Sequence, residues 1–125
     1  MVVEDDVNIG RLERELLAVH GLGSVAAYTG TEALAVFSRC PPDVVLLDCM
    51  LPEMDGFETC RRLRSGCGRE VPIIMLTTLD SDSARKRGLD AGADAYFPKP
   101  FDPDEIISTI HMLLDANGER NDNDS

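Results

Sequence analysis

The sequence is short of positive charge and of long apolar runs. Its 125 residues hold 12 Lys and Arg against 23 Asp and Glu, which gives a formal net charge of −11 at pH 7. Nucleic-acid binding relies on Lys and Arg that displace the counterions of phosphate groups, so we expect no direct nucleic-acid partner. No apolar run approaches the roughly 20 residues that cross a bilayer, so we expect no membrane insertion.

The chain also lacks the marks of a secretory signal and of a zinc site. The N-terminus shows no basic stretch followed by an apolar one, so a cytoplasmic location is the expectation. The cysteines form no CxxC pair and have no set of His ligands nearby, so zinc is not expected. We interpret them as reduced thiols at ordinary positions: Cys40, Cys49, Cys60 and Cys67.

What the chain does hold is a fivefold alternation of short apolar runs and amphipathic helical runs. Hydrophobic residues make up 43% of the chain, enough for one compact domain with a buried core. The pattern predicts strands over residues 1–4, 24–28, 43–47, 73–76 and 95–97. It predicts helices over residues 8–20, 29–39, 55–64, 81–91 and 103–114.

Five βα units predict an α/β fold, a flavodoxin-like doubly wound sheet with five parallel strands in the order 2-1-3-4-5 and five helices on its two faces. The continuous apolar strands 43–47 and 73–76 indicate burial on both faces. The first helix is expected to bury the stripe Ile9, Leu12, Leu16 and Val19. We place the domain at residues 1–115. Residues 116–125 hold almost no apolar side chain and are expected to be a polar tail or linker without fixed structure.

Polar residues that could bind a ligand or take part in catalysis lie at the ends of four predicted strands. The carboxyl ends of parallel strands meet at one edge of the sheet, and this edge is where open α/β sheets bind ligands. If the first and third strands are neighbours, their terminal carboxylates converge. Taken singly, each residue is more often a loop, cap or surface side chain, and only the joint placement indicates a site: Glu4, Asp5, Asp48, Thr77, Thr78 and Lys99.

Three converging carboxylates repel one another, by about 4 kcal/mol for a pair about 4 Å apart at an effective dielectric near 20. Such a cluster needs a cation, and oxygen ligands in an open cage suit Mg²⁺, with Mn²⁺ as an alternative. Lys99 adds a fixed positive charge and Thr77 a hydroxyl. The set suits a phosphoryl group, with Asp48 as the nucleophile.

Four segments resemble, in order and spacing, the receiver domain of bacterial-type response regulators. They are VVEDD at 2–6, LLDCMLPEMDG at 46–56, PIIMLTT at 72–78 and AGADAYFPKPF at 91–101. The resemblance covers essentially residues 1–115. It implies that Asp48 is the phosphoacceptor and that Mg²⁺ is held by Asp5, Asp48 and the main-chain carbonyl of Met50, with Glu4 acting through water.

The resemblance also implies roles for residues around the acceptor. Thr77, Thr78 and Lys99 would contact the attached phosphoryl group, and the Lys99–Pro100 peptide bond would be cis. Tyr96 would be an aromatic switch that turns inward when Thr77 moves toward the phosphate. The donor would be the phosphohistidine of a histidine kinase or of a histidine phosphotransfer protein. The responding surface, built from the fourth helix, fifth strand and fifth helix, would act on a downstream protein target or on an output domain.

Two alternatives stay open. The first is a receiver-like binding module that works without phosphorylation, although every carried-over position is filled here. The second is a phosphatase with an Asp nucleophile, which needs a second Asp two residues later, where this chain has Met50. We therefore expect a signalling domain that catalyses only its own phosphotransfer and dephosphorylation, and not an enzyme acting on external substrates.

Overall fold

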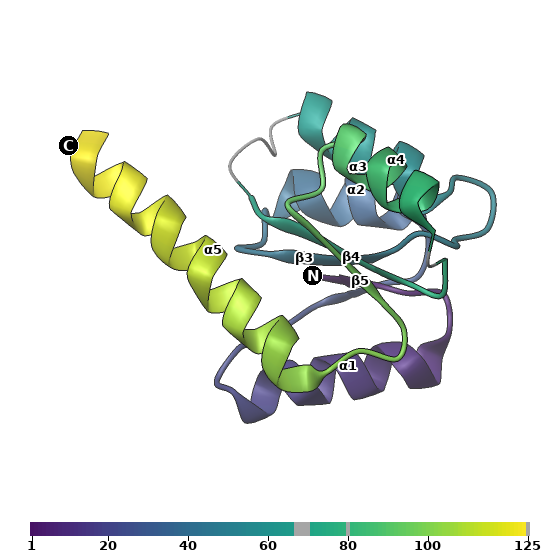
Figure 1. Cartoon of the computed structure of the whole chain (residues 1–125), viewed down its shortest axis with the longest axis horizontal. Helices are drawn as coiled ribbons and strands as arrows, with labels where there is room; N and C mark the ends of the chain where they lie inside the picture. Colours follow the sequence, from purple (N-terminus) through teal and green to yellow (C-terminus); the bar gives the residue numbers. More distant parts are fainter. Residues whose placement is uncertain (67–70, 80, 125) are drawn as a thin grey trace.

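The computed structural model describes residues 1–66, 71–79 and 81–124, and the side chains of 117–124 lie outside that description. Cys67 is therefore outside the described residues. Within the described chain five strands alternate with five helices (Figure 1). They are β1 Val2–Val3, α1 Val7–Val19, β2 Ala26–Ala27, α2 Gly30–Arg39, β3 Val45–Asp48, α3 Gly56–Ser65, β4 Ile73–Thr77, α4 Asp82–Asp90, β5 Ala95–Pro98 and α5 Pro103–Asp124.

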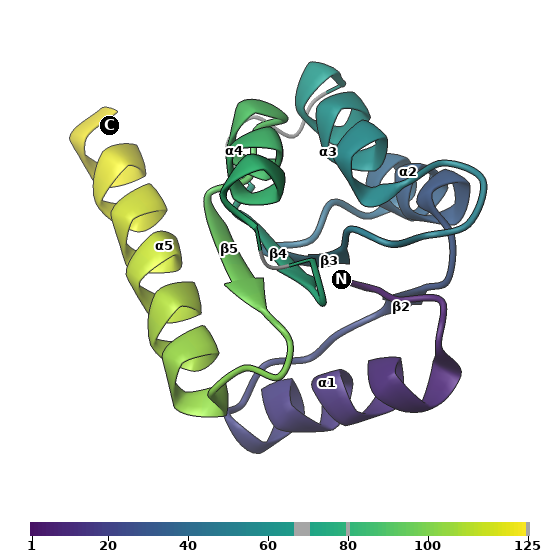
Figure 2. The same cartoon turned by 45° about the vertical axis from the view of Figure 1, so that its right-hand side comes forward.

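The predicted sheet is confirmed. All pairs are parallel and the strand order is β2-β1-β3-β4-β5 (Figure 2). β1 and β2 are shorter than predicted, with two residues each. β3 and β4 each run one residue further than predicted, because Asp48 still pairs with Leu76 and Thr77 still pairs with Pro98. Asp48 and Thr77 are therefore the last residues of the two central strands.

Two helical layers cover the sheet, with α1 and α5 on one face and α2, α3 and α4 on the other (Figures 1 and 2). Successive residues of the central strands face opposite layers. Leu47 and Met75 join the core under α2 to α4, whereas Leu46 and Ile74 join the core under α1 and α5. This confirms that the continuous apolar strands are buried on both faces.

The predicted inward face of α1 is wrong for three of its four residues, and only Leu16 packs against the core, partly buried. Leu12 is 64% exposed and Val19 is 81% exposed, and Ile9 is also exposed. The residues that α1 buries are Gly10, Glu13 and Leu17. Both stripes satisfy the 3.6-residue period, so periodicity alone could not choose between them. The structure turns the stripe with Gly10 toward the sheet, where a Cβ at Gly10 would lie 3.6 Å from Glu4 Cβ, an ordinary van der Waals distance.

The helix ends follow the sequence signals. Thr29 caps α2, its hydroxyl accepting a hydrogen bond of 3.0 Å from the Glu32 amide. Asp55 caps α3 and Ser81 caps α4 in the same way. α5 buries Ile106 and Ile110 and continues to Asp124, into the segment expected to be a polar tail, so the domain boundary at residue 115 stays a prediction.

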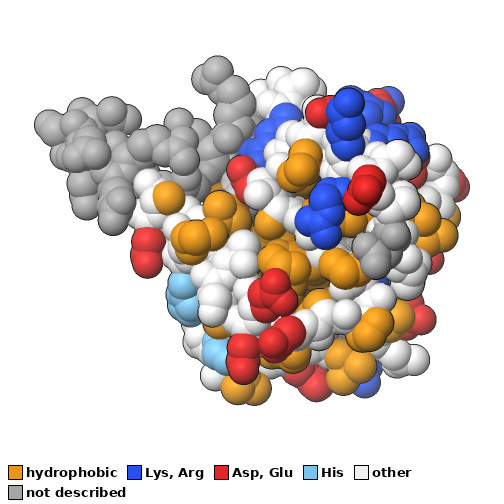
Figure 3. Space-filling view, in the orientation of Figure 1, with side chains coloured by type: hydrophobic (Ala, Val, Ile, Leu, Met, Phe, Trp, Pro, Cys, Tyr) orange, Lys and Arg blue, Asp and Glu red, His pale blue; other side chains and the backbone are white. Residues whose placement is uncertain are grey.

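The surface charge is unevenly spread. Lys and Arg side chains gather over α3 and α4 (Figure 3). Most of this cluster is already paired, since Arg61 and Arg62 bond to Glu58 and Arg87 lies 3.7 Å from Asp55. Pairing of this kind fits a solvated helical face better than a binding patch. Among the described helices, none is long and apolar enough to cross a membrane.

Candidate functional site at the carboxyl edge of the sheet

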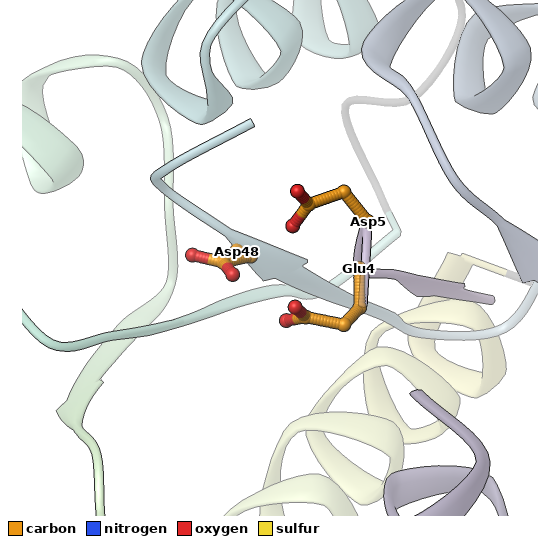
Figure 4. A group of neighbouring side chains, drawn as sticks. All are labelled: Glu4, Asp5 and Asp48. Carbon is orange, nitrogen blue, oxygen red and sulfur yellow. The ribbon is translucent and has the colours of Figure 1, made fainter. Parts of the chain in front are cut away.

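Three carboxylates meet at the carboxyl edge of β1 and β3. Glu4 and Asp5 follow β1, and Asp48 ends the neighbouring β3. One oxygen from each residue lies within 4.8 Å of the other two, and the side chains of Glu4 and Asp5 extend toward Asp48 (Figure 4). Glu4 and Asp48 are buried, whereas Asp5 is exposed. The predicted convergence of the strand-end acids is confirmed.

Asp48 is held in a fixed orientation at the end of β3. Its side chain is nearly buried, and its Oδ1 accepts a hydrogen bond of 2.9 Å from the Met50 amide. The loop after β3 folds back so that the Gly56 amide donates to the Cys49 carbonyl at 2.9 Å. A Cβ at Gly56 would lie 2.2 Å from the Asp48 carbonyl oxygen, so only glycine allows α3 to begin this close to the strand end.

Lys99 supplies the positive charge expected at this edge. Its Nζ donates to Glu4 Oε2 at 2.8 Å and to Asp48 Oδ2 at 3.3 Å. Burial by itself lowers the pKa of the Lys99 ammonium, but its hydrogen bond to Glu4 and the charges of Asp48 and Glu4 raise that pKa above its ordinary value. Lys99 is therefore a fixed cation. The Lys99–Pro100 peptide bond is cis, the form that the resemblance implies.

Even with Lys99 present, the cluster carries excess negative charge. Burial, followed by the hydrogen bond with Asp48, raises the pKa of the Glu4 carboxyl to about 7, and Lys99 only partly opposes the rise. A bound divalent cation would relieve this repulsion. The donors are all oxygens and Asp5 is open to solvent, so the residues present fit Mg²⁺, which keeps several waters.

Thr77 and Tyr96 are linked through the main chain of Leu79. The Leu79 amide donates to Thr77 Oγ1 at 3.1 Å, and the Tyr96 hydroxyl donates to the Leu79 carbonyl at 2.5 Å. Thr77 and Tyr96 are both buried. Thr78 is exposed, with its hydroxyl 3.3 Å from Met50 Sδ. The structure thus brings both threonines to the acidic edge and ties the predicted switch residue to one of them.

Sequence reasoning missed Glu13. It is 5% exposed, on the inward stripe of α1, and its Oε1 lies 3.9 Å from Lys99 Nζ. The signal was present, since Glu13 stands three residues after Gly10 and four before Leu17. The stripe through Leu12 is the more apolar of the two and therefore conceals this signal.

The family model described as "Response regulator receiver domain" matches residues 1–111. The chain belongs to this family. The receiver domain is 44% identical over 114 residues to "Response regulator MprA" of Mycobacterium tuberculosis, covering 91% of this chain and 49% of that protein. It therefore spans about half the length of the curated relatives it matches.

Solved structures agree with this assignment. The receiver domain of Klebsiella pneumoniae RstA, described as BeF3-activated, is 38% identical and superposes with a TM-score of 0.84, covering 90% of this chain and 95% of that one. A CheY-like receiver domain protein of Methanospirillum hungatei is 29% identical with a TM-score of 0.89, covering 95% and 94%. The receiver domain is a signalling domain of two-component systems, and its cluster of Glu4, Asp5 and Asp48 is consistent with a phosphorylation site.

Proposed function

We propose that this receiver domain is a phosphorylation-controlled switch that accepts a phosphoryl group on Asp48. The observation that carries the proposal is the position of the Asp48 carboxylate, which lies among two further acids and the fixed ammonium of Lys99. The donor is the phosphohistidine of a histidine kinase or of a histidine phosphotransfer protein. A two-component receiver implies such a partner.

In the transfer step an oxygen of Asp48 forms a bond to phosphorus. The bond from phosphorus to the donor's imidazole nitrogen breaks, its electron pair stays on that nitrogen, and the product is an acyl phosphate. The Met50 amide holds one carboxylate oxygen and Lys99 faces the other, which limits the orientations that Asp48 can take. Lys99 neutralises charge on the phosphoryl oxygens.

Mg²⁺ supplies further charge neutralisation when bound. Its ligands are Asp5, Asp48 and the Met50 main-chain carbonyl, with Glu4 acting through water, and Mn²⁺ is a possible substitute. This assignment is supported by the oxygens of Glu4, Asp5 and Asp48 lying within 4.8 Å of one another. Hydrolysis of the acyl phosphate by water resets the switch.

The switch runs from Thr77 to Tyr96. The attached phosphoryl group offers Thr77, Thr78 and Lys99 new oxygens to bind. Thr77 Oγ1 then exchanges its hydrogen bond with the Leu79 amide for one to the phosphoryl group. Tyr96 is bonded to the carbonyl of the same Leu79, so a shift of this main chain reaches the surface of α4, β5 and α5.

The proposal also covers the bounds of the domain, its location in the cell and the recipient of its signal. We place the domain at residues 1–115, in the cytoplasm, with a downstream protein or an output domain outside this chain as the recipient of the signal. The length of the MprA relatives supports an output domain, because this chain covers only 49% of the first of them.

The test is intact-protein mass spectrometry after incubation with acetyl phosphate, in Mg²⁺ and in EDTA. The wild type should gain one phosphoryl group only with Mg²⁺, and Asp48→Asn should gain none. Asp90→Asn, which changes an exposed acid on α4, is the matched control and should behave as the wild type. A folded wild type that never gains mass would refute phosphorylation and favour the phosphorylation-independent binding module.

A further inference from the structure

The buried carboxylate of Glu13 has no role in the mechanism above. Among the residues that the structure describes, its Oε1 is a buried side-chain oxygen without a hydrogen-bond partner. Buried polar atoms are normally paired, and an unpaired one costs about 1–3 kcal/mol. A leucine at this position of the stripe would have avoided that cost. The feature therefore calls for a functional explanation.

This unpaired oxygen lies 3.9 Å from the ammonium of Lys99. That distance is too long for a hydrogen bond but short enough for a strong electrostatic attraction in a buried setting. Lys99 Nζ bonds Glu4 on the acidic edge at 2.8 Å, and its contact with Asp48 is longer, at 3.3 Å. The ammonium thus lies within 4 Å of both the Asp48 and the Glu13 carboxylates.

We propose that Glu13 is a positioning residue that competes with Asp48 for Lys99 and so weakens the hold of this site on an added anionic group. The inference rests on the proposed function, since the anionic group is the phosphoryl group. A negative charge at Glu13 attracts the ammonium toward α1 and also repels a phosphoryl group on Asp48. Both effects favour the unphosphorylated state, and burial raises the pKa of Glu13 to about 7, so the charge is present in part at neutral pH.

If Glu13 competes for Lys99, then removing its charge should change the affinities for a cation and for an anion in opposite directions. Replacing Glu13 with neutral glutamine removes negative charge near the cluster and frees Lys99 to move toward Asp48. Mg²⁺ then binds more weakly, because it competes with a closer ammonium. An anion on Asp48 binds more tightly for the same reason. A merely structural role for Glu13 would instead loosen the site and weaken both.

The experiment measures two affinities in the wild type, Glu13→Gln and Glu15→Gln. The probes are Mg²⁺ alone and beryllofluoride at saturating Mg²⁺, the anion named in the description of the RstA relative. Glu15→Gln is the matched control, because it removes the same charge from an exposed position on the same helix. We expect Glu13→Gln to bind Mg²⁺ about threefold more weakly and beryllofluoride about threefold more tightly, with little change in Glu15→Gln.

Each outcome of the two binding measurements supports or overturns the inference. Weaker binding of both probes, or no change in either, overturns the inference while leaving the proposed function intact. A wild type that binds neither probe overturns both. Circular dichroism verifies the fold, and Glu13→Leu, which fills the inward stripe with an apolar side chain, is the second variant if Glu13→Gln does not fold. The same pair of opposite shifts is expected for Glu13→Leu.

Discussion

The ring of Tyr96 on β5 packs directly against Gly88 on α4. A Cβ at Gly88 would lie 2.9 Å from Tyr96 Cδ2 and 2.9 Å from Met75 Sδ. Tyr96 is only 4% exposed, and its hydroxyl bonds to the Leu79 carbonyl. The absence of a side chain on α4 is therefore what lets the proposed switch residue lie inside the domain.

We expect Gly88→Ala to destabilise the domain by about 1–3 kcal/mol, because the added methyl group overpacks against Tyr96 and Met75. This range already allows for the higher helix propensity of alanine, which by itself would stabilise the helix by about 1 kcal/mol. Chemical denaturation measures the change. Gly23→Ala is the control, since nothing lies within 4 Å of a Cβ there. Equal stability of Gly88→Ala and wild type would contradict the close packing.

Asp48→Asn should leave a folded protein that is more stable than the wild type in EDTA, by about 1 kcal/mol. Replacement removes repulsion within the three-acid cluster, and loss of the charge paired with Lys99 offsets most of that gain. Thermal unfolding in metal-free buffer measures the difference. A lower melting temperature for Asp48→Asn would show that the attraction between Asp48 and Lys99 stabilises the fold by more than the repulsion from Glu4 and Asp5 destabilises it.

Asp5→Asn should abolish stabilisation by Mg²⁺ without lowering metal-free stability. Asp5 is exposed, so its replacement disturbs no core packing. In the wild type, Mg²⁺ binds the native state, and a concentration one hundred times its dissociation constant adds about 2.7 kcal/mol. Melting temperatures across a Mg²⁺ titration test this. An unaltered Mg²⁺ response in Asp5→Asn would remove this residue from the proposed ligands.

Stability in EDTA should fall as the pH rises from about 5 to 7. Burial raises the pKa of the Glu4 and Glu13 carboxyls from 4.5 to about 7, so the folded state binds more protons than the unfolded state between these values. The stability gained from these protons is complete below pH 4.5 and is lost as the pH passes about 7.

The contribution of Glu13 to this pH dependence can be isolated. Glu13→Gln should flatten the profile between pH 5 and 7, because glutamine does not titrate, whereas Glu15→Gln should leave its shape unchanged. Denaturation at four or five pH values is sufficient. An identical slope in the wild type and Glu13→Gln would show that Glu13 does not titrate in this range.

The sequence by itself determined the fold class, the strand order and most of the site. Strand and helix periods are local properties, and parallel strands in this order bring Asp5, Asp48 and Lys99 to one edge whatever the details of packing. The motifs around these residues also sufficed to indicate the receiver family. The roles assigned to these residues, and to Glu4, Met50, Thr77, Thr78 and Tyr96, remain predictions.

Only the tertiary structure decided which stripe of α1 is buried. Two stripes, one through Leu12 and one through Glu13, satisfy the same helical period, and in the structure the stripe with Gly10 and Glu13 faces the sheet. That choice places a carboxylate beside Lys99, 86 positions away along the chain by their numbering. Contacts between residues so distant in sequence depend on how a helix is rotated against the sheet, which periodicity does not specify.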